Sequence, residues 1–161
     1  MHMKQLYTVT TIAENKPGVL YRIADLFLRR KINIESLTVS DTGEKGMSRF
    51  TIVVLAEQCL VEKIGKQLYR IIEVTKVIES LDQDLVAREI SLIKVSAKNL
   101  AQRKEIENIV RLSKGRIVYV GSNYLVIEMT GIEAEVRQIH ELLKPFGIKE
   151  RVHSGRIAVF K

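Results

Sequence analysis

The chain has 161 residues, of which 46% are hydrophobic and 28% are charged, and its formal net charge at pH 7 is +7. This composition is typical of a globular protein with one domain or two small ones. No apolar run approaches the about 20 residues that a membrane-spanning helix needs, and the first residues do not resemble a secretory signal. We therefore expect a cytoplasmic protein, or a mature form whose targeting segment has been removed, that does not bind membranes.

Candidate catalytic and metal-binding residues are few. Cys59 is the only cysteine, which excludes an intrachain disulfide, and we expect a small, partly buried residue at the start of a helix. The histidines, His2, His140 and His153, share no metal-ligand spacing with Cys, Asp or Glu. No phosphate loop, dinucleotide fingerprint or nucleophile elbow is present. The sequence therefore predicts neither a catalytic centre nor a metal site.

The first half of the chain alternates strand and helix patterns. Runs rich in β-branched and aromatic residues predict strands at 5–13, 33–40, 49–55 and 74–80. Apolar residues at helical spacing predict helices at about 17–30 and 58–72. The order βαββαβ gives an α+β fold, a ferredoxin-like sandwich with four antiparallel strands in one layer and two helices in the other.

The turn before the first helix contains the strongest indication of a ligand site. It reads Asn15-Lys16-Pro17-Gly18, and an apolar stripe begins behind it with Val19 and Leu20. Pro17 suits the first position of a helix because its missing N–H would be unbonded there. We expect the N–H groups of Gly18, Val19 and Leu20 to point out of the helix N-terminus, where a carboxylate or phosphate can bind. A purely structural turn is the alternative interpretation.

This stretch resembles the start of an ACT domain, the small βαββαβ module that binds amino acids. More narrowly, Glu14 to Leu20, Arg29-Arg30 and the run Asn33-Ile34-Glu35-Ser36-Leu37-Thr38-Val39 resemble the regulatory (small) subunit of acetolactate synthase, also called acetohydroxyacid synthase. That family usually has Gly-Tyr where this chain has Lys31-Ile32. A glycine would suit the left-handed residue that closes a helix. Lys31 must therefore adopt a positive φ, at a cost of roughly 1 kcal/mol, or the helix must end differently.

The second half repeats the pattern. A polar connector, 82–87, separates an ACT domain at 1–81 from a C-terminal domain at 88–161. Strands are predicted at 90–95, 117–120, 125–129 and 148–160, the last one interrupted at Ser154-Gly155, and helices around 106–110 and 132–143. This gives a second ferredoxin-like unit, without a Pro-Gly turn after its first strand. Arg88-Glu89-Ile90 and residues 147–150 and 154–158 also resemble the small-subunit family.

The resemblance implies an effector site between two ACT domains of a dimer. The residues implicated are Asn15, Pro17, Gly18, Val19 and Leu20 of one subunit with Asn33 and Ile34 of its neighbour. The N–H groups would hold the carboxylate of an amino acid, and the asparagine amide oxygens would accept from its ammonium group. Val19 and Ile34 would line a pocket for a branched side chain. The alternatives are core packing for these two apolar residues and a turn or strand-edge role for Asn33.

The resemblance also implies the function. A small subunit is not catalytic alone: it activates the catalytic (large) subunit and confers feedback inhibition by a branched-chain amino acid, usually valine, in valine, leucine and isoleucine biosynthesis. The family's catalytic partner uses thiamine diphosphate, Mg²⁺ and FAD, and this chain is expected to hold no cofactor. Because a lone ferredoxin-like sheet leaves exposed edge strands, we expect a homodimer through the first domain, with an eight-stranded sheet.

Other functions fit parts of the sequence. An RNA-binding βαββαβ protein needs stacking aromatics on its third strand, where this chain has Met47, Arg49 and Ile52. The basic residues are spread through both halves of the chain instead of forming a block, so no nucleic acid partner is expected. A stand-alone ACT-type amino-acid sensor that regulates a different partner is the remaining alternative.

Overall fold

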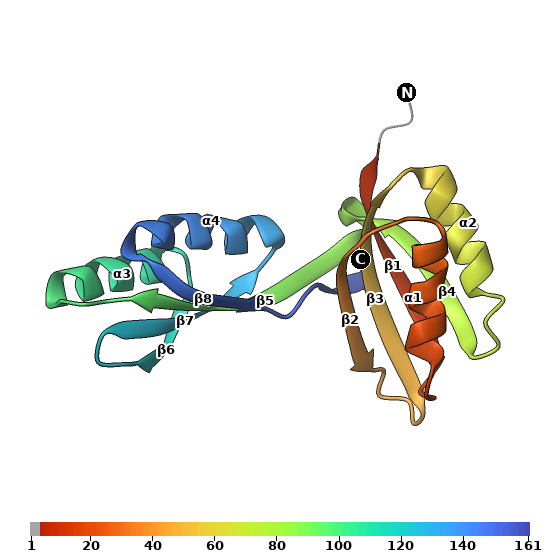
Figure 1. Cartoon of the computed structure of the whole chain (residues 1–161), viewed down its shortest axis with the longest axis horizontal. Helices are drawn as coiled ribbons and strands as arrows, with labels where there is room; N and C mark the ends of the chain where they lie inside the picture. Colours follow the sequence, from red (N-terminus) through yellow and green to blue (C-terminus); the bar gives the residue numbers. More distant parts are fainter. Residues whose placement is uncertain (1–3) are drawn as a thin grey trace. The chain divides into compact units, whose positions relative to one another are not determined.

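The computed structural model describes residues 4–161; Met1 to Met3, including His2, lie outside the described part. The chain forms two compact units. The first consists of the residues up to Ala87 together with Arg156–Lys161, and the second is Arg88–Gly155. Each is an α+β sandwich with an antiparallel sheet and two helices on one face (Figure 1). The predicted fold class is confirmed.

The first unit contains the elements expected from the sequence, with slightly different ends. They are β1 (Gln5–Glu14), α1 (Val19–Arg29), β2 (Ile34–Asp41), β3 (Met47–Ala56), α2 (Gln58–Leu68), β4 (Val74–Leu81) and the 3₁₀ turn η1 (Asp82–Asp84). The strand order is β2-β3-β1-β4, which leaves β2 and β4 at the edges. The edge position of β2 matters for the site described below.

The core of the first unit lies between the helices and one face of this sheet. Val19, Ile23 and Phe27 recur at helical spacing on α1 and are each 1% exposed. They pack into one cluster with alternate residues of the two central strands, among them Val9 and Ile52. The matching periods, 3.6 residues for the helix and 2 for the strands, made this arrangement predictable from the sequence.

Helix α1 ends in a left-handed residue. Lys31 has φ 55°, and the N–H groups of Lys31 and Ile32 donate to the carbonyl oxygens of Leu28 and Phe27 at 2.9 and 3.0 Å. The first of the two predicted alternatives is therefore confirmed: a lysine occupies the position that favours glycine.

Replacing Lys31 with glycine is expected to raise the free energy of unfolding by about 0.5–1 kcal/mol, because glycine adopts a positive φ without a Cβ clash. Urea denaturation followed by circular dichroism measures the change. Lys45→Gly is the matched control, since Lys45 is an exposed lysine of the β2–β3 loop that is not among the residues with positive φ. An equal or larger gain in the control would contradict the explanation.

The second unit repeats the plan. It contains most of β5 (Leu85–Ser96), followed by α3 (Leu100–Leu112), β6 (Arg116–Val120), β7 (Tyr124–Gly131), α4 (Glu133–Leu143), the 3₁₀ turn η2 (Lys144–Phe146) and β8 (Ile148–His153), in the sheet order β6-β7-β5-β8. Asn99 caps α3 by accepting from the Gln102 N–H at 2.9 Å. Lys114, with φ 57°, closes α3 one residue before Gly115.

The structure adds detail at both ends of the second domain. The connector expected at 82–87 is partly ordered strand, because β5 begins at Leu85, whose side chain is 5% exposed. The C-terminal strand divides into β8 and β9 (Ile157–Phe160) at Gly155, which has φ 77°. Residues 156–161, the end of the expected second domain, pack with the first unit.

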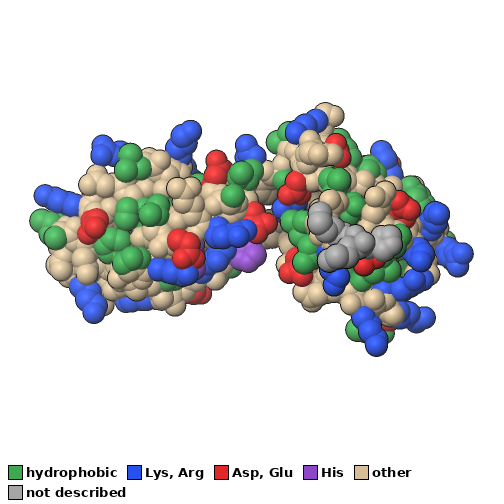
Figure 2. Space-filling view, turned by 90° about the horizontal axis from the view of Figure 1, so that it is seen from above, with side chains coloured by type: hydrophobic (Ala, Val, Ile, Leu, Met, Phe, Trp, Pro, Cys, Tyr) green, Lys and Arg blue, Asp and Glu red, His purple; other side chains and the backbone are tan. Residues whose placement is uncertain are grey.

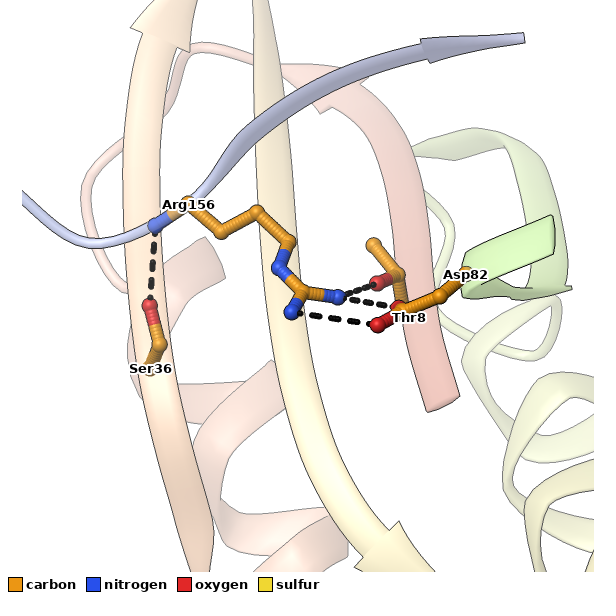
Figure 3. A network of polar contacts seen from close by, with 4 residues as sticks. All are labelled: Thr8, Ser36, Asp82 and Arg156. Atoms are coloured by element: carbon orange, nitrogen blue, oxygen red, sulfur yellow. Dashed lines mark hydrogen bonds and ion pairs between the residues drawn. The ribbon is translucent and has the colours of Figure 1, made fainter. Parts of the chain in front are cut away.

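Arg156 holds this C-terminal segment on the first unit (Figure 3). Its backbone N–H donates to Ser36 Oγ on β2 at 3.2 Å, and its side chain reaches Thr8 Oγ1 on β1, also at 3.2 Å. The guanidinium also pairs with both carboxylate oxygens of Asp82. The segment thus lies on the sheet face that the helices leave open, where Thr8 is fully buried.

The basic residues do not form one block on the visible surface. Figure 2 shows Lys and Arg side chains dispersed among acidic and apolar ones over the face drawn, on both units. Several are in ion pairs, such as Arg29 with Asp25 and Arg137 with Glu133, each at 2.7 Å. This distribution gives no support to the nucleic acid alternative.

The carboxyl of Glu79 on β4 is expected to make stability depend on pH. It lies against Gly65 of α2, and burial, then the charge of Glu62, raises its pKa above the ordinary value, with Lys66 opposing them. Since the folded state holds this proton more tightly than the unfolded chain, the carboxylate destabilises the fold as the pH rises through and above its raised pKa. Glu79→Gln should be more stable than the parent at pH 7 and no more stable below about pH 4, in urea titrations at both values. Equal stability at pH 7 would contradict this.

Candidate effector site

The turn between β1 and α1 has the geometry of a ligand-binding helix start. Gly18 is the N-cap of α1 with φ 85°, and a Cβ built on it would meet no atom within 4 Å. Pro17 precedes the cap, so it lies two positions before the first helical residue, Val19, and not at the first position as predicted. The turn is anchored to the β2–β3 hairpin by the Asn15 N–H, which donates to the Gly46 carbonyl at 2.8 Å.

The free donors at this helix start differ slightly from the prediction. The Val19 N–H donates to the Lys16 carbonyl at 3.3 Å, so it is not available to a ligand. Among the described residues, no backbone acceptor is found for the N–H groups of Gly18, Leu20 and Tyr21. These three donors, at the positive end of the helix dipole, can hold a carboxylate.

The apolar side chains near the turn have different environments. Val19 is 1% exposed and packs in the core of the first unit, which agrees with the core-packing alternative. Leu20, in contrast, is 43% exposed. Ile34 is half-buried against the same core. Of these three, Leu20 offers the most accessible apolar surface beside the turn.

Asn33 and Ile34 lie at the other end of the sheet from the turn. Ile34 pairs with Val54, and Val54 pairs with Tyr7 near the start of β1. The turn follows Glu14 at the end of β1. At about 3.4 Å per strand residue, the stretch from Tyr7 to Glu14 separates the two groups of candidate residues by about 24 Å within one chain. A single chain therefore does not assemble the predicted site.

Charged residues that the sequence analysis did not select surround the turn. Lys16 pairs with Glu14, whose hydrogen bond and charge raise the lysine pKa. Arg22 on α1 pairs with Glu73 at 2.7 Å. The pKa of Glu73 is lowered chiefly by a hydrogen bond from its own backbone N–H, and next by the hydrogen bond and the charge of Arg22. Because Glu73 is distant in sequence and joins the turn only through tertiary pairing, no local pattern pointed to it.

The comparisons with known proteins match both units. Residues 88–161 match a family model described as the small subunit of acetolactate synthase, and residues 9–76 match one described as an AHAS small subunit-like ACT domain. The acetolactate synthase small subunit of Aquifex aeolicus is 40% identical over 153 residues, which cover 95% of this chain and 80% of that protein. The chain belongs to the acetolactate synthase small-subunit family.

Further relatives agree with this assignment. The probable acetolactate synthase small subunit of Archaeoglobus fulgidus is 42% identical over 155 residues, covering 96% of each chain. The crystal structure of the acetolactate synthase small subunit from Thermotoga maritima has a TM-score of 0.89 at 34% identity and covers 98% of each chain. The predicted family is confirmed, and with it a regulatory subunit that is not catalytic on its own.

Three further observations on this small subunit concern other kinds of site. In the described part of the chain, no group of three or more His, Cys, Asp or Glu side chains could hold a metal ion. Within residues 4–161, no helix combines the length and apolar character needed to cross a bilayer. Cys59 is exposed, so the expectation of a partly buried cysteine was wrong: α2 turns Val61, Ile64 and Leu68 inward, and Cys59 lies on its outer side.

Proposed function

We propose that this small subunit activates the catalytic subunit of acetolactate synthase and confers feedback inhibition by a branched-chain amino acid, with valine as the first candidate. It would act in the cytoplasm, in valine, leucine and isoleucine biosynthesis. Thiamine diphosphate, Mg²⁺ and FAD would belong to the catalytic partner, and this chain would hold none of them. The family assignment supports the partner, and the geometry of the turn supports the ligand.

A homodimer formed along β2 would complete the site. β2 is an edge strand, and two edge strands related by a two-fold axis pair antiparallel. The start of one β2 would then lie beside the end of the other. Asp41, at the end of β2, pairs with Ser48, and Ser48 pairs with Ala13 at the turn end of β1. Ile34 of the partner subunit would thus come to the end of the sheet that carries Gly18.

The chemistry of such a site suits a free amino acid. The N–H groups of Gly18, Leu20 and Tyr21 would hold its carboxylate. The amide nitrogen of Asn33 donates to Glu35 Oε1 at 3.1 Å, which leaves the Asn33 Oδ1 of the partner subunit to accept from the ammonium group. Leu20 and Ile34 of the partner subunit would contact a branched side chain. The observation that carries this proposal is the distance within one chain between the turn residues and the start of β2. Only a second chain can bring these two groups together.

Feedback then has a physical form. A ligand that touches both subunits binds more tightly to the dimer arrangement that presents both sets of contacts, and so shifts the population toward it. The catalytic subunit would respond because it contacts the small subunit differently in the two arrangements.

Calorimetric titration of the full chain with valine, leucine and isoleucine tests the ligand. Reconstitution with a purified catalytic subunit, with and without valine, tests the activation. We expect saturable binding of at least one of the three amino acids, a several-fold rise in synthase activity with the small subunit present, and loss of that rise at saturating ligand. No binding by any of the three would refute the effector site, and no change in synthase activity would refute the activation.

A further inference from the structure

One acidic residue contacts the chain on both sides of the turn that carries Gly18. Glu73 lies in the connection between α2 and β4. Its backbone carbonyl accepts from the N–H of Glu14, the last residue of β1, at 2.9 Å, and its Oε1 accepts from Arg22 Nη2 at 2.7 Å. Arg22 lies in the first turn of α1, where its N–H donates to the Gly18 carbonyl at 3.1 Å. We call Arg22 and Glu73 the clamp, because they join the strand before the turn to the helix after it.

The clamp is more shielded from water than an ordinary surface ion pair. The Glu73 side chain is 13% exposed, and no hydrogen-bond partner is found within residues 4–161 for its other carboxylate oxygen, Oε2, which is buried. In the Arg29–Asp25 pair, farther along α1, the carboxylate side chain is 24% exposed and the arginine 74%, against 45% for Arg22. An exposed ion pair contributes little to stability, whereas a shielded carboxylate depends strongly on its partner. The clamp is therefore the firmer of the two pairs.

The helix start needs such a restraint to present its donors. The N-cap is a glycine with φ 85°, so it has no side chain to cap the helix, and glycine has more backbone freedom than any other residue. The proposed ligand requires the N–H groups of Gly18, Leu20 and Tyr21 to point at one carboxylate. Contacts with other segments of the chain must therefore fix their direction. The hydrogen bond from the Asn15 N–H to the Gly46 carbonyl, at 2.8 Å, holds the beginning of the turn, and the clamp holds its end, where the donors are.

We propose that Arg22 and Glu73 are positioning residues of the effector site. The clamp holds the turn in the arrangement that binds the carboxylate of a branched-chain amino acid, and the two side chains act through the turn without touching the ligand. When the turn adopts this arrangement for only a fraction of the time, the apparent affinity falls by that fraction. By linkage, a bound amino acid must in turn favour the clamped arrangement. The inference rests on the proposed effector site.

Calorimetric titration of the full chain tests the clamp. Arg22→Met removes the positive charge and keeps most of the side-chain length, and Glu73→Gln, as a second variant, removes the negative charge and keeps the size. Arg22→Lys keeps a cation beside Glu73. Arg29→Met is the matched control, because it breaks an ion pair of the same length, 2.7 Å, on the same helix. Each variant is titrated with valine, leucine and isoleucine, after its circular dichroism has been compared with that of the parent.

We expect Arg22→Met and Glu73→Gln to lower the affinity for the amino acid that binds the parent most tightly by about fivefold or more. Arg22→Lys and Arg29→Met should stay within about twofold of the parent. Hydrogen exchange of the Glu14 amide adds a readout that a purely stabilising ion pair would not give. Without the amino acid, this exchange should be faster in Arg22→Met than in the parent, and saturation with the amino acid should slow it again.

Two results would overturn the inference and leave the effector site standing. One is that Arg22→Met and Glu73→Gln lose no more affinity than Arg29→Met. The other is that saturation with the amino acid leaves the exchange of the Glu14 amide in Arg22→Met unchanged. If the parent binds none of the three amino acids, the effector site itself is refuted, and the inference fails with it.

Discussion

Replacing Gly18 with aspartate is expected to weaken binding of a branched-chain amino acid at least tenfold. The new carboxylate would stand at the helix start, beside the N–H groups of Gly18, Leu20 and Tyr21 that are proposed to hold the ligand's own carboxylate. Two like charges about 5 Å apart interact by about 3 kcal/mol at an effective dielectric constant of about 20. Even half of that energy, after screening by solvent, corresponds to about a tenfold loss of affinity.

Gly18→Asn is the matched control for this change. Asparagine has nearly the size of aspartate and, like it, tolerates the left-handed conformation that φ 85° requires. No atom lies within 4 Å of the position of the new Cβ, so the Cβ of either side chain fits without a steric clash. The calorimetric affinity of Gly18→Asn should stay within a few fold of the parent. If the asparagine variant loses as much affinity as the aspartate variant, backbone strain and not charge would explain the loss.

Replacing Arg156 with methionine is expected to lower the free energy of unfolding by about 1–3 kcal/mol. The arginine side chain is 9% exposed and binds Asp82, which is 57% exposed. Without the guanidinium, Asp82 can return to water, but the Thr8 hydroxyl loses its charged donor while it remains fully buried. A hydrogen bond to a charged group contributes about 1.5–3 kcal/mol, and an unsatisfied buried group costs about 1–3 kcal/mol.

Urea denaturation and hydrogen exchange measure this effect together. The exchange of the Ile157–Phe160 amides should accelerate, because the contacts that hold β9 on the first unit are lost. Arg70→Met, at an exposed arginine of the same unit, should leave both measurements unchanged. Thr8→Val combined with Arg156→Met should recover part of the loss, since replacing both partners removes the unsatisfied hydroxyl. No change in stability or exchange in the single variant would refute the role of Arg156.

Much of the fold followed from local patterns. Helical spacing placed Val19, Ile23 and Phe27 in the core, and two rounds of the βαββαβ order gave two sandwiches. Comparing Lys31 with the glycine that such a position favours left two endings of α1 open, and the structure has the left-handed one. Local sequence determines these features because backbone dihedral preferences and side-chain periodicity act within a few residues.

The wrong expectation for Cys59 and the position of the C-terminal segment both depend on residues distant in sequence. Cys59 was expected to be partly buried and is exposed, because the position of α2 on the sheet decides which side of the helix faces water. The C-terminal residues end the family match at 88–161 and pack on the first unit, where Arg156 binds Thr8, Ser36 and Asp82. No pattern around residue 156 specifies contacts more than seventy residues away.

The sequence by itself determined the fold of each unit and the family, and it singled out the Pro17-Gly18 turn as the candidate effector site, since all three depend on contiguous residues. The tertiary structure alone decided that Asn33 and Ile34 lie at the opposite end of the sheet from that turn. It also placed Arg22 and Glu73 beside the turn and the C-terminal segment on the first unit. The physical reason is that strand pairing and side-chain burial join segments that are far apart along the chain. No pattern within a few residues predicts such contacts.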